Sequence, residues 1–98
     1  MEIGSLLQGE HAPLLLQKMQ ILKGIAGANI IYKSFLEGEI MPAHNNPTEV
    51  FVIIISGKMD ITLEGKNNLM EAGDFICFPA KAIHSLSCIN DAKVLIIK

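Results

Sequence analysis

Tryptophan is absent from the sequence, aromatic residues make up only 5%, and no long apolar run occurs. The longest uninterrupted apolar segment, Val50 to Ile55, is far shorter than the roughly 20 residues that a membrane-spanning helix needs. Only two cysteines are present, and Cys77 and Cys88 do not form a C-x-x-C motif. We therefore exclude a membrane span and a disulfide framework, and we expect both cysteines to be thiols packed in the core.

Charge of either sign is scarce, since Lys, Arg, Asp and Glu together make up only 18% of the residues. The 8 Lys and Arg against 10 Asp and Glu leave a net charge of -2. Without a basic face to contact phosphates, nucleic acid is not an expected partner. No basic start followed by an apolar stretch and a cleavage site directs export, so we expect a cytoplasmic protein. At 98 residues the chain can fill one core. We expect one domain over residues 1–98, with residues 1–17 as an N-terminal extension or edge element.

Isoleucine is abundant, with 15 of 98 residues, and much of it lies in short β-branched clusters rather than in helical spacing. We predict strands over residues 28–36, 48–55, 59–64, 75–78, 83–87 and 93–97. Turns are expected at Gly57, at residues 65–68, at Gly73 with Asp74, and at Asn90 with Asp91. Many short strands without long helices between them predict an all-β antiparallel sandwich or barrel.

Residues 13–24 have two interpretations. Pro13 at the start, unbranched apolar residues and Gly24 at the end favour a helix. From Lys18 onward, polar and apolar residues alternate, which favours a strand. We favour the strand because the remaining chain needs sheet partners.

Two groups of residues carry a recognisable spacing. In the first, the gaps are five, one, three and six residues between Gly38, His44, Asn46, Val50 and Gly57. In the second, they are five, one, two and three residues between Gly73, Pro79, Lys81, His84 and Cys88. This pair of motifs resembles those of the cupin superfamily, and the 15 residues that separate them are typical of its small, single-domain microbial members of the type-2 kind.

The resemblance implies a small antiparallel jelly-roll β-barrel with a cavity at one end. Metal-binding cupins use two histidines and a glutamate from the first motif and one histidine from the second. Here His44 and His84 match, whereas Asn46 replaces a histidine and Val50 replaces the glutamate. We therefore expect either no cofactor or a weakly bound divalent metal (Zn, Ni, Mn or Fe), because valine offers no lone pair and a neutral amide is a poor ligand.

Asn46 and Glu49 are further metal-ligand candidates beside the two histidines. Glu49 stands one residue before the expected carboxylate position. Alternation along a strand directs it away from a cavity lined by Val50 and Val52, unless a bulge at Pro47 turns it inward.

The expected ligand site lies in the barrel cavity. Its predicted ligand-binding residues are His44, Asn46, Val50, Val52, His84 and Leu86, with Ile54 and Cys88 as possible further wall residues. Lys81 is expected in a loop near the cavity mouth. We interpret the protein as a small-molecule-binding cupin with a degenerate metal site and no assignable reaction. The alternative is a metal-dependent cupin enzyme of the dioxygenase, isomerase or decarboxylase kind, using His44 and His84 with Asn46 or Glu49.

A homodimer is predicted from the strand that contains Val50 to Ile55. A barrel strand normally alternates apolar and polar residues, but here Phe51, Ile53 and Ile55 would form an apolar outer row. Such a row needs a cover, either Leu14 to Leu16 of the same or a second chain, or a second barrel. The cupin resemblance favours the arrangements with two chains.

Overall fold

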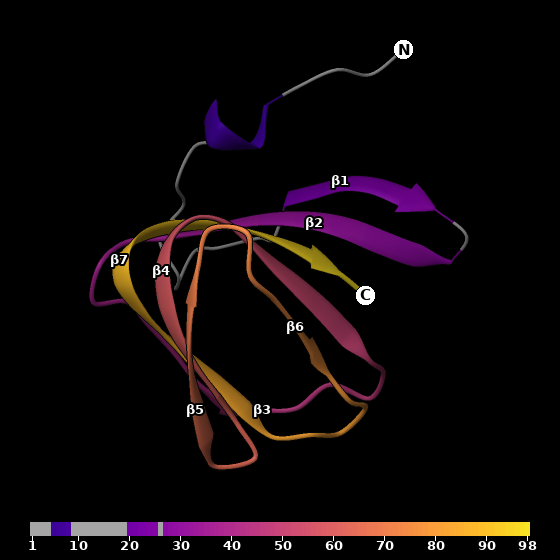
Figure 1. Ribbon diagram of the computed structural model, residues 1–98. Coiled ribbons are helices and arrows are strands. Elements are labelled where there is room, and N and C mark those ends of the chain that lie inside the picture. The colour runs from indigo at the N-terminus through magenta and orange to yellow at the C-terminus, as the bar shows by residue number, and fades with distance from the viewer. Residues whose placement is uncertain (1–4, 9–19, 26) are drawn as a thin grey trace.

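Two long antiparallel strands form the centre of the structure (Figure 1). They are β4 (Val50–Leu63) and β7 (His84–Ile97), which pair along almost their whole length. The computed structural model describes residues 5–8, 20–25 and 27–98. The other elements are a 3-10 helix η1 (Leu6–Gln8) and strands β1 (Gln20–Ile25), β2 (Ala28–Phe35), β3 (Ile40–His44), β5 (Lys66–Glu71) and β6 (Phe75–Phe78). Within the described ranges, no helix is long and apolar enough to cross a membrane.

The shorter strands flank the two long ones, and every pairing is antiparallel. The order is β1-β2-β7-β4-β5, with β3 also on β7 and β6 also on β4. The first half of β4 pairs with β6 and its second half with β5, while β7 pairs first with β3 and then with β2. Both long strands therefore pass through two layers, and the predicted all-β antiparallel fold is confirmed.

The bend of β4 lies at Gly57. Its φ of +84° is unfavourable for other residues, and a Cβ atom there would lie 2.1 Å from the carbonyl oxygen of Asp91 and 2.6 Å from the Cα atom of Ala92. The ladder register shifts three times between Ile54 and Met59. The turns predicted at Gly57 and at Asn90 with Asp91 are thus wrong, because neither strand reverses there. The glycine allows a bulged strand to bend and touch its neighbour.

Two further strands differ from the sequence prediction. The turn expected over residues 65–68 is limited to Glu64 and Gly65, and β5 begins at Lys66. Strand β3 was not predicted, because Pro42 lies inside it and the register shifts between Met41 and His44. Residues 20–25 form a strand, as the favoured interpretation of this segment requires, and residues 13–19 lie outside the described part.

The core lies between the layers. Val50, Val52 and Ile54 are buried and alternate with half-buried neighbours, which confirms the predicted parity of this strand. Cys88 packs in the same core, as expected. Cys77 does not, because it faces the opposite side of the sheet next to Phe51 and is only half-buried. The prediction of two core cysteines is therefore correct for one of them.

Candidate functional site

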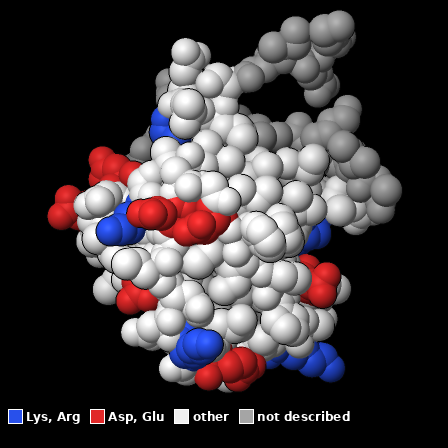
Figure 2. Space-filling model, viewed as in Figure 1, with Lys and Arg blue, Asp and Glu red and all other residues white. Residues whose placement is uncertain are grey.

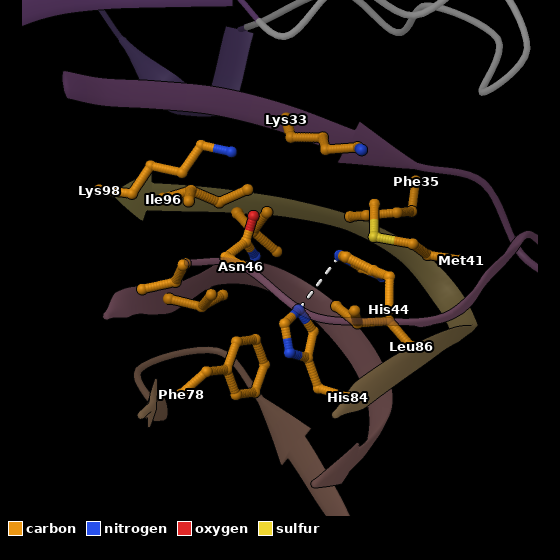
Figure 3. Close-up of a pocket in the computed structure, with 13 residues that line it drawn as sticks. Lys33, Phe35, Met41, His44, Asn46, Phe78, His84, Leu86, Ile96 and Lys98 are labelled. Atoms are coloured by element: carbon orange, nitrogen blue, oxygen red, sulfur yellow. Dashed lines mark hydrogen bonds between the residues drawn. The ribbon is translucent and has the colours of Figure 1, made fainter. Parts of the chain in front are cut away.

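A cavity of about 240 Å³ opens between the layers (Figure 3). All six predicted ligand-binding residues line it: His44, Asn46, Val50, Val52, His84 and Leu86. The remaining lining residues are apolar, except for Lys33 and Lys98. Ile54 and Cys88 belong to the core and are not in the cavity wall.

The two histidines meet because their strands are neighbours. His44 ends β3, His84 begins β7, and the two residues are paired in the ladder. Their Nε2 atoms lie 3.1 Å apart, and their rings meet edge to face with centroids 4.3 Å apart. His84 is 3% exposed and stacks on Phe78 at 4.0 Å, which holds its ring in place.

Backbone carbonyls fix the tautomers of both histidines. The Nδ1 atom of His44 lies 2.9 Å from the carbonyl oxygen of Pro42, and that of His84 lies 3.1 Å from the carbonyl oxygen of Ala82. A carbonyl oxygen only accepts, so each Nδ1 atom carries a proton and donates it. When both rings are neutral, both Nε2 atoms are then acceptors that lie 3.1 Å apart with no proton between them. A proton or a cation between them would satisfy both nitrogens.

Burial opposes charge on the inner ring. It lowers the pKa of His84, and the nearby charges of His44 and Lys98 act in the same direction, while the hydrogen bond to the Ala82 carbonyl acts against them. The neutral imidazole that results keeps its Nε2 lone pair available to a partner in the cavity.

Two lysines form the opposite side of the cavity, as Figure 3 shows. Lys33 lies on β2, is only 7% exposed, and holds its ammonium group 5.3 Å from the centre of the Phe35 ring. Lys98 directly follows β7, and its side chain extends toward Lys33. Asn46 lies between the lysines and the histidines. Both lysines were missed at the level of the sequence, although Ile31, Lys33 and Phe35 alternate along one strand and so share its inner face.

The profile of the cupin domain family matches residues 32–98. The chain belongs to the cupin family. An RmlC-like cupin protein from Desulfovibrio desulfuricans superposes with a TM-score of 0.82 at 19% identity, over 99% of this chain and 94% of that chain. An RmlC-like cupin family protein with a double-stranded β-helix fold, from Methanocaldococcus jannaschii, gives 0.72 at 25% identity, over 83% and 77%. These similarities confirm the jelly-roll fold.

A conserved protein of unknown function from Streptococcus pyogenes is 26% identical to this cupin, with a TM-score of 0.69. The match covers 71% of this chain and 61% of that chain, so the cupin described here corresponds to about three fifths of the streptococcal protein. No protein of curated function matches the sequence.

The residues of this cupin fit only part of a metal site. Two Nε2 atoms 3.1 Å apart are close enough to hold one zinc ion as neighbouring ligands, since zinc–nitrogen bonds are about 2.0–2.1 Å long. Hydrogen bonds from their Nδ1 atoms orient both rings as metal-binding histidines require. However, no group of three His, Cys, Asp or Glu side chains that could hold a metal occurs in the described residues. Of the two further predicted ligands, Asn46 lines the same cavity and Glu49 does not.

Glu49 is not brought to this site. It is exposed, and its carboxylate accepts a hydrogen bond from the Cys77 thiol. Cys77 is paired with Phe51 in the ladder between β6 and β4, and Phe51 faces the outer side of β4. Lys81 is an exposed loop residue with φ of +68°, and its backbone N–H donates to the Asn46 carbonyl at 2.7 Å. This bond joins the loops of the two motifs and so helps to set the position of Asn46 at the cavity.

Proposed function

We propose that this cupin binds a small molecule in its barrel cavity and has a degenerate metal site. The observation that carries the proposal is the convergence of five polar side chains on one apolar cavity: one each from β2, β3 and β7, one from the loop between β3 and β4, and one from the residue that follows β7. A cavity of about 240 Å³ lies below the roughly 300–1,000 Å³ that drug-sized ligands occupy, so the ligand is small.

The wall and the polar groups have separate roles in this proposal. Val50, Val52 and Leu86 present buried apolar surface that contributes roughly 25 cal/mol for each Å² of ligand surface removed from water. His84 and Asn46 have fixed positions and orient the ligand through hydrogen bonds. This part of the site is preorganised, because backbone contacts hold His84 and the backbone of Asn46 before any ligand arrives.

Asn46 and Asn45 offer a matched test of the cavity. Asn46 lines the cavity, whereas its neighbour Asn45 is exposed and does not. A library of small metabolites is screened against the protein by ligand-observed NMR. We expect ligands that compete for one site and bind about tenfold more weakly to Asn46→Ala, because a lost hydrogen bond costs about 1 kcal/mol or more, and equally well to Asn45→Ala. A library without any ligand, or ligands insensitive to Asn46→Ala, would refute the proposal.

The second candidate function is a metal-dependent reaction of the dioxygenase, isomerase or decarboxylase kind. The spacing and orientation of the two Nε2 atoms favour it. Zn, Ni, Mn or Fe would be held by His44 and His84 with Asn46, and would act as a Lewis acid toward the ligand. We expect such binding to be weak and to require both histidines, because no carboxylate occurs among the described residues that line the cavity. Titration of Zn²⁺ or Ni²⁺ tests this, and sub-micromolar affinity that survives His84→Ala would contradict it.

We also propose that the protein is a cytoplasmic homodimer that associates through the outer face of β4. Phe51, Ile53 and Ile55 are half-buried there, and Phe51 stacks on Phe75, which is 64% exposed. The short helix η1 also contacts β4. It is held in place by Lys93, whose Nζ atom donates to the carbonyl oxygen of Leu7 in this helix. The candidate cover at residues 14–16 lies outside the described part. On the face in Figure 2, acidic and basic side chains are interspersed over a mostly uncharged surface.

Light scattering coupled to size exclusion tests the dimer. We expect twice the 10.7 kDa mass of one chain at micromolar concentration, and dissociation by Ile53→Lys, which places a charge in the apolar face. Asn45→Lys is the matched control, since it also replaces a neutral side chain by a lysine, at an exposed position outside β4. A monomeric native protein would contradict the proposal.

A further inference from the structure

The charge of the cavity is one-sided. Its described lining includes two lysines and two histidines, and no aspartate or glutamate. The sequence has no arginine and only eight lysines, so a quarter of its permanent positive charges face this one small space. Apolar walls strengthen the effect, because the field of a charge is screened less in such surroundings than in water.

Lys33 is the more deeply buried of the two lysines. A buried ammonium group is unfavourable unless a counter-charge accompanies it, and Lys33 is 7% exposed. Burial lowers the pKa of Lys33, the charge of Lys98 lowers it further, and the charge of Glu39 opposes both effects. Glu39 does not line the cavity, and its carboxylate accepts from the backbone N–H of Leu36. An anion between the two lysines would lie where their repulsion is greatest and would relieve it.

We propose that the ligand of this cavity is a small organic carboxylate, with its carboxylate group held between the ammonium groups of Lys33 and Lys98. This inference rests on the proposed small-molecule binding and adds the chemical class of the ligand. The organic part of the ligand lies along Val52 and Ile96, and its far end reaches the histidine pair.

The surroundings favour a carboxylate over a phosphate. Phosphate sites in proteins commonly combine arginine forks or several backbone N–H groups at a helix terminus. Here no arginine exists, the wall is formed by β-strands, and most of the lining side chains are apolar. Two ammonium groups match the two oxygens of one carboxylate, and the apolar wall matches an organic substituent.

Matched pairs of acids and neutral amides test the proposal. Benzoate with benzamide, and hexanoate with hexanamide, are titrated into the 98-residue protein by calorimetry or NMR. We expect each acid to bind at least tenfold more tightly than its amide, since hydrogen bonds to charged groups are stronger than neutral ones. Lys33→Gln and Lys98→Gln should each weaken the acid at least tenfold and leave the amide unchanged. Lys81→Gln removes the same charge from an exposed loop and should change neither.

The outcomes separate this inference from the proposed function. Equal affinity for acid and amide, both weakened by Asn46→Ala, would overturn the carboxylate and leave small-molecule binding in place. Tighter binding of inorganic phosphate or phenyl phosphate than of benzoate would also overturn the carboxylate. Failure of every acid and amide to bind overturns it too, and the metabolite screen then decides the proposed function separately. If Lys33→Gln does not fold, Lys98→Gln decides, because Lys98 lies beyond the last strand and is less buried.

Discussion

Gly57→Ala is expected to destabilise the protein strongly. An L-residue held at a φ of +84° costs about 1–2 kcal/mol relative to glycine. The added Cβ atom would also stand 2.1 Å from the Asp91 carbonyl oxygen, so one of the two central strands must move by roughly 1 Å to restore an ordinary contact. Overpacking of this kind costs about 1–3 kcal/mol. Together the two effects predict a loss of about 2–5 kcal/mol, a large part of the roughly 5–15 kcal/mol that stabilises a domain.

Gly65→Ala is the matched control for this experiment. Gly65 has a φ of +79°, but no heavy atom lies within 4 Å of the position that an added Cβ atom would take. It should lose only the conformational part, about 1–2 kcal/mol. Urea denaturation followed by circular dichroism gives both free energies of unfolding. Equal losses in the two variants would refute the argument that β4 and β7 touch at the bend and that this contact requires glycine.

Three further predictions concern the site and the thiols. Burial lowers the pKa of His84 below its ordinary value of 6.5, so the folded protein prefers the neutral ring. The stability of the protein should therefore fall as the pH drops below about 6.5, and should fall less steeply in His84→Gln. Urea titrations at several pH values measure both. Cys88 should resist a thiol reagent in the native protein and Cys77 should react first, but slowly, because burial raises the pKa of both; rapid native labelling of Cys88 would contradict its place in the core. The double variant Val50→Glu with Asn46→His should bind Zn²⁺ tighter by orders of magnitude, and unchanged affinity would show that the cavity cannot seat the larger ligands.

Alternation along strands made the inner surface of the barrel predictable. Val50, Val52 and Leu86 were assigned to the cavity because residues two apart share a face, and the structure places them there. The spacing of His44 and His84 within two motifs placed both at one mouth. The family match over residues 32–98 agrees with that interpretation.

The remainder depends on contacts between distant parts of the chain. Gly57 has the same local character in a turn and in a bend, and only the approach of Asp91 distinguishes them. The 3.1 Å contact between the two Nε2 atoms depends on the register of β3 against β7. The sequence does not predict β3, because Pro42 within this segment disfavours a strand. Lys33 could have been assigned to the inner face by parity, but a lone lysine in a strand usually faces solvent.

The shared use of β4 and β7 by both layers has a consequence for how the protein opens. Because each strand belongs to both halves of the barrel, neither half can detach while the other remains folded. Amide hydrogens in the two strands should therefore exchange only through global unfolding, at one common free energy. Val50, Val52, His84 and Leu86 all lie on these strands, so this wall of the cavity cannot be remodelled by a local fluctuation. A ligand must enter a site whose shape is already set, and its binding energy stabilises the whole barrel as a single cooperative unit.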